Sequence, residues 1–186
     1  MMKIDKKIIE KIQSLDTPTI ISISGFGGSG KSTFAKLLGS EIQAPVICVD
    51  SFSRDSSASS LWDSMDFERL KKEVLLPFIN GENPIFHGHY DSKLEAFIKD
   101  IRVEHRDRLI IEGVGLFRPE LMNYFSYTIW IDCPLEEAIE RGIKRDREIH
   151  KNPQDEKWNG VWKKNDLEYF ESFNPKTNAD LVVDNY

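Results

Sequence analysis

A glycine-rich segment near the N-terminus has the spacing of a nucleotide phosphate-binding loop. Residues 25–32 read Gly-Phe-Gly-Gly-Ser-Gly-Lys-Ser, which fits the pattern G-x-x-x-x-G-K-[ST]. A β-branched run at residues 19–24 precedes the segment, and a helix-forming stretch follows it. A plain glycine-rich turn is the alternative, but the ordered strand, loop, Lys-Ser pair and helix favour a phosphate site. The segment therefore predicts binding of a nucleoside triphosphate with Mg²⁺.

The residue types of this segment indicate how it would hold phosphates. Glycines let successive backbone N–H groups turn toward phosphate oxygens, and the N-terminus of the following helix adds positive potential. Lys31 can bridge the β- and γ-phosphates, and the Ser32 hydroxyl can bind Mg²⁺. The predicted phosphate-binding residues are Gly25, Gly27, Gly28, Ser29, Gly30, Lys31, Ser32 and Thr33. The motif alone does not separate kinases from GTPases, ATPases or motors.

Two apolar runs end in a carboxylate. Asp50 follows Val-Ile-Cys-Val and Glu112 follows Leu-Ile-Ile, which places both at the carboxyl ends of buried strands, where open α/β sheets bind ligands. A kinase needs a carboxylate to orient and deprotonate the attacking hydroxyl, and Asp50 is the candidate. Glu112 is the candidate for holding Mg²⁺, directly or through water. A capping role for Asp50 and a salt-bridged Glu112 are the structural alternatives.

A cationic cluster lies within residues 136–151 of an acidic chain. Arg141 and Arg145 are four residues apart on one predicted helix face, so both could contact the same phosphate chain as a lid closes. Arg145 is the predicted catalytic phosphate contact, and Arg141 and Arg147 are further candidates. Pairing on the surface is the alternative, because Glu137 stands four residues before Arg141.

The elements that must position these residues are those of an α/β protein, because apolar β-branched runs alternate with helical patterns. The predicted strands are residues 19–24, 45–50, 108–112, 127–132 and 179–183. The predicted helices are residues 5–14, 31–40, 66–80, 135–150 and part of 158–170, while 51–60 and 80–92 are predicted loops. We expect a doubly wound, mainly five-stranded parallel sheet of the P-loop NTPase type, flanked by helices, with a helical lid near residues 141–165.

Composition narrows the class of protein. The 186 residues, 40% of them hydrophobic and 30% charged, indicate one globular domain spanning residues 1–186. The net charge of −6 disfavours nucleic-acid or anionic-membrane partners. Two cysteines and the lack of a long apolar run favour a cytoplasmic protein without a disulfide framework. The expected partners are a nucleoside triphosphate and a small-molecule acceptor, and a homo-oligomer is left open.

The ordered set of motifs resembles the uridine kinase family, whose relatives include phosphoribulokinase and bacterial pantothenate kinase. The likeness is closest to short bacterial uridine kinase-like proteins and covers nearly the whole chain. It rests on the phosphate loop, Val-Asp-Ser-Phe-Ser-Arg at 49–54, Trp-Asp-Ser-Met-Asp-Phe at 62–67, Tyr-Asp at 90–91, Ile-Ile-Glu-Gly at 110–113, Arg-Gly-Ile-Lys-Arg-Asp at 141–146 and the tail at 179–184. The resemblance implies an ATP- and Mg²⁺-dependent kinase acting on the 5′-hydroxyl of a pyrimidine nucleoside.

The resemblance also implies roles for individual residues. Asp50 is similar in position to the family's base toward the ribose 5′-hydroxyl, and Arg54 in the same segment is a further candidate for substrate binding. Asp63 matches an acid that binds ribose hydroxyls, with an N-terminal helix acid as the alternative. Tyr90 is similar to a tyrosine that could stack on the pyrimidine.

Several positions depart from the family pattern. Phe52 and Ser53 stand where the family has tyrosines, and Gly142 replaces the second arginine of the lid. The same chemistry on a pantothenate-like or sugar-like alcohol is therefore an alternative. A regulatory module that binds ATP or GTP as a switch is a second alternative. A GTPase would need an Asn/Thr-Lys-x-Asp segment that reads guanine, but the candidate positions at 132–134 and 180–182 read Asp-Cys-Pro and Asp-Leu-Val.

Overall fold

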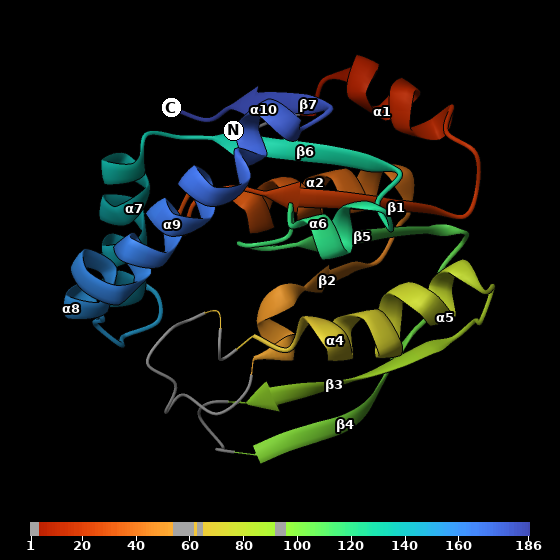
Figure 1. Cartoon of the computed structure of the whole chain (residues 1–186), viewed down its shortest axis with the longest axis horizontal. Helices are drawn as coiled ribbons and strands as arrows, with labels where there is room; N and C mark the ends of the chain where they lie inside the picture. The colour runs from red at the N-terminus through yellow and green to blue at the C-terminus, as the bar shows by residue number, and fades with distance from the viewer. Residues whose placement is uncertain (1–3, 54–61, 63–64, 92–95) are drawn as a thin grey trace.

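A computed structural model gives the fold of the chain (Figure 1). The structure describes residues 4–53, 62, 65–91 and 96–186. Two residues predicted to bind substrate, Arg54 and Asp63, lie outside the described residues, so their roles stay predictions.

The centre of the fold is a parallel sheet of five strands. From one edge to the other these are β2 (Val46–Cys48), β5 (Arg108–Glu112), β1 (Thr19–Ser24), β6 (Tyr127–Asp132) and β7 (Leu181–Asp184). All adjacent pairs are parallel, which confirms the predicted doubly wound sheet. The strand expected at 45–50 is shorter, because the chain turns into the 3-10 helix η1 (Val49–Phe52) after Cys48.

Helices cover both faces of the sheet. Ile20 and Ile21 of β1 point to opposite faces, because side chains alternate along a strand. Ile21 packs in a cluster with α1 (Lys6–Gln13) and α2 (Lys31–Ile42). Ile20 belongs to a second cluster, formed with α4 (Phe67–Leu70), η2 (Lys71–Leu75), α5 (Leu76–Ile79), α6 (Pro119–Met122) and α9 (Lys163–Phe173). The sheet is thus the middle layer of three, and all of β1 is buried.

The helix predicted at 66–80 is present, with an adjustment before a proline. Asp66 caps its start by accepting a hydrogen bond from the Arg69 N–H at 3.0 Å. Pro77 lacks an N–H, and in a regular helix its ring crowds the carbonyl four residues before it. The segment just before the proline, η2, is a π turn in which the N–H of Leu76 bonds to the carbonyl of Lys71. The wider turn lets the helix continue through the proline.

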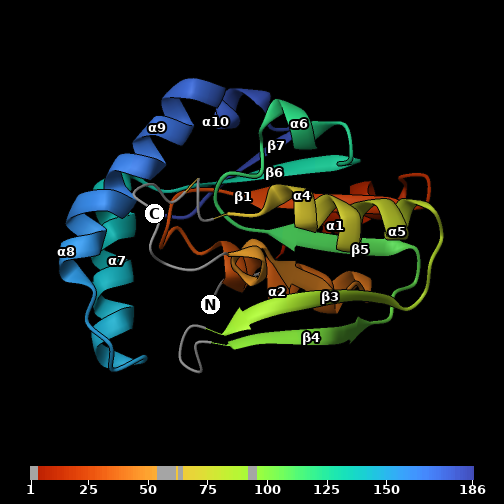
Figure 2. The ribbon, with the colours of Figure 1, turned by 60° about the horizontal axis from the view of Figure 1, so that its bottom comes forward.

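The prediction of a loop over residues 80–92 is wrong. Most of that segment is the strand β3 (Ile85–Asp91), which pairs antiparallel with β4 (Ala96–Val103). Its side chains do alternate, but an inward position holds the polar residue His87, which concealed the pattern. The His87 ring packs on Phe52 with 5.4 Å between centroids. The hairpin forms a separate layer beside the β2 edge of the sheet (Figures 1 and 2).

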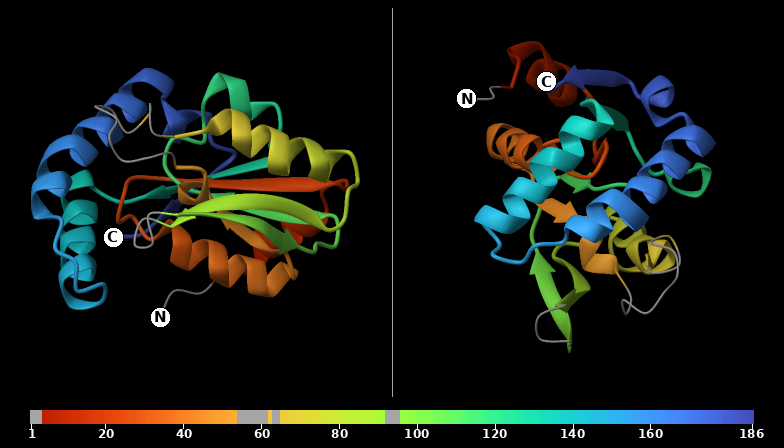
Figure 3. Two further views of the ribbon diagram at one scale, coloured as in Figure 1. Left: turned by 90° about the horizontal axis from the view of Figure 1, so that it is seen from below. Right: turned by 90° about the vertical axis from the view of Figure 1, so that its left-hand side faces the viewer.

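A group of helices follows β6 and lies across the carboxyl end of the sheet (Figure 3). It consists of α7 (Leu135–Glu148), α8 (Asp155–Lys157), the π turn η3 (Trp158–Trp162) and α9, and α10 (Pro175–Asn178) then leads to β7. The helices predicted at 135–150 and within 158–170 are confirmed, while their action as a lid stays a prediction. In the described part of the chain, no helix is both long and apolar enough to cross a bilayer.

The hydroxyl of Tyr169 fixes α9 to the sheet. Tyr169 is fully buried, and its hydroxyl oxygen accepts a hydrogen bond from the Phe117 N–H at 2.9 Å. The hydroxyl lies 3.2 Å from the Ser24 Oγ, which in turn donates to the Gly113 carbonyl at 2.9 Å. Every member of this buried chain has a partner, so the ends of β1 and β5 are tied to α9.

We expect Tyr169→Phe to lower the free energy of unfolding by about 1–3 kcal/mol, because the buried Phe117 N–H loses its acceptor. Urea unfolding measures the change. Tyr127→Phe, at the half-buried start of β6, is the matched control and should cost less. Equal unfolding curves for the wild type and Tyr169→Phe would show that the hydroxyl does not hold α9.

Candidate active site

The predicted phosphate loop joins the end of β1 to the start of α2. Gly30 is the N-terminal cap of α2, so the loop ends at the unpaired N–H groups of the first helical turn. Gly28 and Gly30 have φ angles of +82° and +97°, which side chains disfavour. A Cβ atom at Gly28 would also overlap the carbonyl oxygen of Ala138 in α7. The loop therefore needs glycine both for its backbone conformation and for the close packing of α7.

A cavity of about 800 Å³ adjoins the loop. Its wall includes predicted residues from separate parts of the chain, namely Gly27, Gly28, Gly30, Lys31, Ser32, Thr33, Asp50, Glu112, Arg141 and Arg145. The predicted phosphate-binding groups, two carboxylates and two arginines thus meet at the carboxyl end of the sheet, as expected for an open α/β fold.

Other predicted residues do not line this cavity. Gly25 and Ser29 belong to the loop, but Ser29 is fully buried beneath it. Tyr90 lies on β3 and is absent from the described residues of the cavity wall. Arg147 points to Asp155, whose Oδ2 accepts from the Arg147 Nε at 3.2 Å. The roles given to these residues stay predictions.

Lys31 is held inside the loop. Its side chain is only 7% exposed, and its Nζ donates a hydrogen bond to the Phe26 carbonyl at 2.8 Å. An ammonium group has three donors, so two remain for other acceptors. The ammonium is therefore positioned beside the loop for the phosphate oxygens that the motif predicts.

Asp50 and Glu112 lie at neighbouring strand ends. Asp50 is exposed in η1 directly after β2, and Glu112 is the last residue of β5 and 4% exposed. Cys48 pairs in register with Glu112. Burial raises the pKa of the Cys48 thiol, and the nearby Asp50 and Glu112 carboxylates raise that pKa further. Both carboxylates line the cavity, and within the described residues Glu112 has no salt-bridge partner.

The cavity wall suits a magnesium ion that arrives with a nucleotide. Ser32 and Glu112 contribute a hydroxyl and a carboxylate, the hard oxygen donors that Mg²⁺ prefers. Among the described residues no three His, Cys, Asp or Glu side chains gather into a ready-made metal site. Mg²⁺ bound to phosphates needs no such cluster, because it keeps waters and takes only one or two protein ligands.

Arg145 is oriented by a buried carboxylate. The Asp146 Oδ1 accepts hydrogen bonds from the Arg145 Nε and a terminal guanidinium nitrogen at 3.1 and 3.0 Å. The Asp146 Oδ2 accepts from the Trp158 Nε1 at 2.7 Å. His150 Nδ1 lies 3.1 Å from the same carboxylate. Asp146 thus joins α7 to η3 and holds the Arg145 guanidinium at the cavity wall.

Arg141 lies at the cavity wall and is also paired on its own helix, while its contact with phosphate stays a prediction. It pairs with Glu137, the helical partner expected from the spacing. Its guanidinium donates a further hydrogen bond to the Asn185 carbonyl at 2.8 Å. Asn185 in turn donates from its Nδ2 to the Ser29 carbonyl of the phosphate loop at 2.7 Å. Arg141 is therefore part of a link between α7, the tail after β7 and the loop.

Gly142, which departs from the family pattern, has a structural explanation. A Cβ atom at this position would lie 2.5 Å from the Trp158 ring. Trp158 is 4% exposed and forms an edge-on pair with Trp162, with 4.9 Å between centroids, and both rings line the cavity. The indole occupies the space that a side chain would take at residue 142.

Asp166 is a site residue that the sequence analysis missed. It lies on α9, is 4% exposed and lines the cavity. Its Oδ2 accepts a hydrogen bond from the Gly27 N–H of the phosphate loop at 2.8 Å. Burial raises the pKa of Asp166 to about 6, although Lys31 and the Gly27 hydrogen bond both oppose the rise. The available signal was an acid three residues before Tyr169, on the buried face of a predicted helix.

Comparisons with known proteins give a consistent result. A family model described as an AAA domain matches residues 21–159. The uridine kinase of Clostridium botulinum (strain Okra / Type B1) is 31% identical over 151 residues, covering 69% of this chain and 69% of the relative. That of Alkaliphilus metalliredigens (strain QYMF) is 30% identical over 151 residues, covering 72% and 71%. A solved structure described as a possible uridine kinase from Bacillus stearothermophilus has a similar fold, with a TM-score of 0.72, 22% identity and 96% of both chains covered.

We expect Asp166→Asn to change the pH dependence of stability. The folded protein raises this pKa from 3.8 to about 6, so the contribution of Asp166 to stability should be greatest below about pH 4 and be lost as the pH rises through about 6. The variant removes the ionisable group and keeps an acceptor for the Gly27 N–H. At neutral pH it should be more stable by up to about 3 kcal/mol, as measured by urea unfolding.

The control is Glu171→Gln, which removes one exposed carboxylate from the same helix and should follow the wild-type profile. Parallel stability profiles for the wild type and Asp166→Asn between about pH 4 and pH 7 would contradict the raised pKa.

Proposed function

Because the chain belongs to the uridine kinase-like family of P-loop kinases, we propose that it transfers the γ-phosphoryl group of ATP to the 5′-hydroxyl of a pyrimidine nucleoside, uridine or cytidine. The observation that carries the proposal is the single cavity that joins the phosphate loop to Asp50 and Glu112. A switch that only binds nucleotide needs the phosphate loop, whereas phosphoryl transfer also needs a carboxylate facing an acceptor.

The proposed mechanism assigns a task to each part of the cavity wall. The loop N–H groups, Lys31 and Arg145 neutralise charge on the phosphates. Ser32 and Glu112 would hold Mg²⁺, which when bound would neutralise charge on the phosphates. Asp50, exposed at the corner of the cavity, accepts the proton of the attacking hydroxyl. Trp158 and Trp162 cover the loop from the lid side and limit the access of water.

The acceptor side of the cavity favours a second candidate function as well. Phe52, which stands where the family has a tyrosine, is fully buried, and the Arg69 guanidinium stacks on its ring at 4.6 Å. Phe52 therefore belongs to the core, and it offers no hydroxyl group to a pyrimidine ring. Of the two residues that replace the family's tyrosines, Phe52 and Ser53, only Ser53 lines the cavity. The second candidate is the same phosphoryl transfer to another small alcohol, pantothenate-like or sugar-like.

We expect Asp50→Asn to retain affinity for ATP while losing at least about 100-fold in turnover, because an amide cannot take the proton of the acceptor hydroxyl. ADP release with MgATP measures turnover against uridine, cytidine, nucleoside monophosphates, pantothenate and simple sugars. Turnover on uridine or cytidine supports the proposal. Turnover only on another alcohol of the panel would keep the kinase mechanism and assign a different acceptor. Silence on every acceptor despite ATP binding would favour the regulatory module, and near-normal rates for Asp50→Asn would reject Asp50 as the base.

Lys31→Ala should weaken ATP binding and slow transfer together, because the ammonium contacts the phosphates both before and during transfer. Calorimetric titration with MgATP and the ADP-release assay measure the two effects. Lys164→Ala, which removes an exposed ammonium from α9, is the control and should leave both values unchanged. Unchanged affinity and rate for Lys31→Ala would overturn the assignment of the phosphate loop.

A further inference from the structure

The phosphate loop already holds an anion supplied by the chain itself. The Asp166 carboxylate reaches from α9 to the Gly27 N–H at 2.8 Å, across 139 positions of sequence. Lys31 lies close enough for its charge to stabilise the ionised carboxylate. Asp166 is 4% exposed and Lys31 is 7% exposed, so this interaction is shielded from bulk water. Shielding makes the contact between charges stronger than it would be on the surface.

The donor nucleotide needs the same loop. The N–H groups at the N-terminus of α2 hold the α- and β-phosphates, and the lysine pairs the β- and γ-phosphates. In this structure the Lys31 Nζ is turned back to the Phe26 carbonyl, beside Gly27 in the first half of the loop. With the α- and β-phosphates at the N-terminus of α2, the terminal phosphate of a triphosphate would extend toward the first half of the loop, where Gly27 and Asp166 meet. A diphosphate ends before this point.

We propose that Asp166 is a specificity-determining residue for the donor: its carboxylate occupies the Gly27 N–H and competes with the terminal phosphate of ATP, but not with ADP. Binding of ATP brings a second anion to the place where the carboxylate lies, so the Asp166–Gly27 hydrogen bond must be released. Binding of ADP leaves this hydrogen bond in place. The inference rests on the proposed use of ATP as the donor and is independent of the acceptor.

The charge of Asp166, rather than its shape, carries this effect. Asn has nearly the same shape and can still accept the hydrogen bond from the Gly27 N–H, but it lacks the negative charge. A purely structural tether between α9 and the loop would survive in Asp166→Asn. In Asp166→Ala the tether is lost, so if its role were purely structural, the variant would bind ATP and ADP more weakly by similar factors. Competition predicts that both variants bind ATP more tightly.

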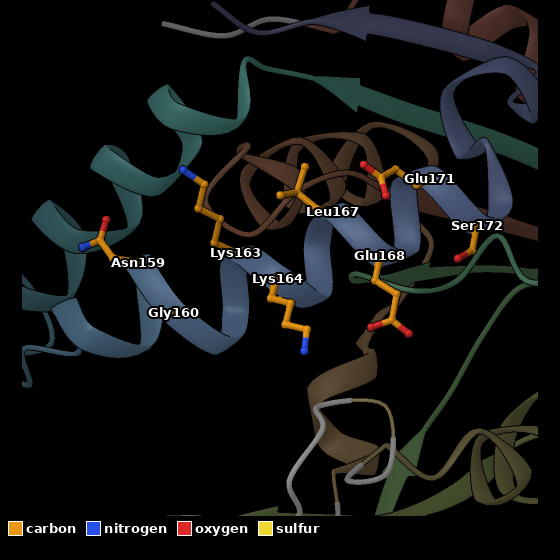
Figure 4. Close-up of a pocket in the computed structure, with 8 residues that line it drawn as sticks. All are labelled: Asn159, Gly160, Lys163, Lys164, Leu167, Glu168, Glu171 and Ser172. Atoms are coloured by element: carbon orange, nitrogen blue, oxygen red, sulfur yellow. The ribbon is translucent and has the colours of Figure 1, made fainter.

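The test is calorimetric titration of the wild type, Asp166→Asn and Asp166→Ala with MgATP and with MgADP. We expect the Kd for ATP to fall about tenfold in Asp166→Asn, because one buried like charge is removed. The Kd for ADP should change less than about twofold. Glu171→Gln is the matched control, because Glu171 projects from α9 into a separate surface hollow (Figure 4) and should leave both constants unchanged. Thermal melts confirm that each variant is folded.

Each outcome bears on the proposal. A selective gain in ATP affinity supports it, whether the wild type binds ATP weakly or not at all. Equal shifts for ATP and ADP, or weaker ATP binding in both variants, would overturn it in favour of a structural tether. Absence of ATP binding in every folded variant would overturn it together with the proposed function. A wild type that phosphorylates nucleosides while Asp166→Asn binds ATP unchanged would overturn this inference alone.

Discussion

The structure depends on one constraint, that the backbone at Gly25, Gly27, Gly28 and Gly30 must carry no side chains, because neighbouring groups already occupy the space around it. This constraint lets neighbouring elements approach the loop backbone itself. The Ala138 carbonyl of α7 packs where a side chain at Gly28 would lie. On the other sides Asp166 binds the Gly27 N–H and Asn185 binds the Ser29 carbonyl. The glycine positions of the loop therefore let α7, α9 and the tail after β7 pack against its backbone.

The carboxyl end of the sheet brings the glycine-rich loop together with the other residues of the candidate active site. Parallel strands all end on the same side, so β2 and β5 deliver Asp50 and Glu112 to the edge where β1 delivers the loop. The Tyr169 hydroxyl joins the ends of β1 and β5 to α9, the helix that carries Asp166. One buried polar chain therefore sets the distance between the sheet and the helix that lines the cavity with Asp166.

The sequence predicts best where periodicity and local motifs agree. The five strands, the long helices and the phosphate loop have strong local patterns, and their positions are correct within a few residues. The hairpin of β3 and β4 was missed because a histidine occupies an inward position of β3, at His87. Asp166 was missed for a different reason, since its contact with Gly27 spans 139 positions and the helical pattern marks only the buried face, not the partner of the acid. The reason for a glycine at position 142 likewise appears only in the structure, where the Trp158 ring occupies the space of a side chain.

The long-range contacts of the phosphate loop have a consequence for biosynthesis. The ribosome makes the loop early, but its hydrogen-bond partners at Asp166 and Asn185 follow 139 and 156 positions later. Contacts of such high sequence separation form late and slow the folding of a domain. During translation the nascent chain therefore carries a glycine-rich loop without its cover, and a finished nucleotide pocket exists only after α9 and the tail have emerged from the exit tunnel.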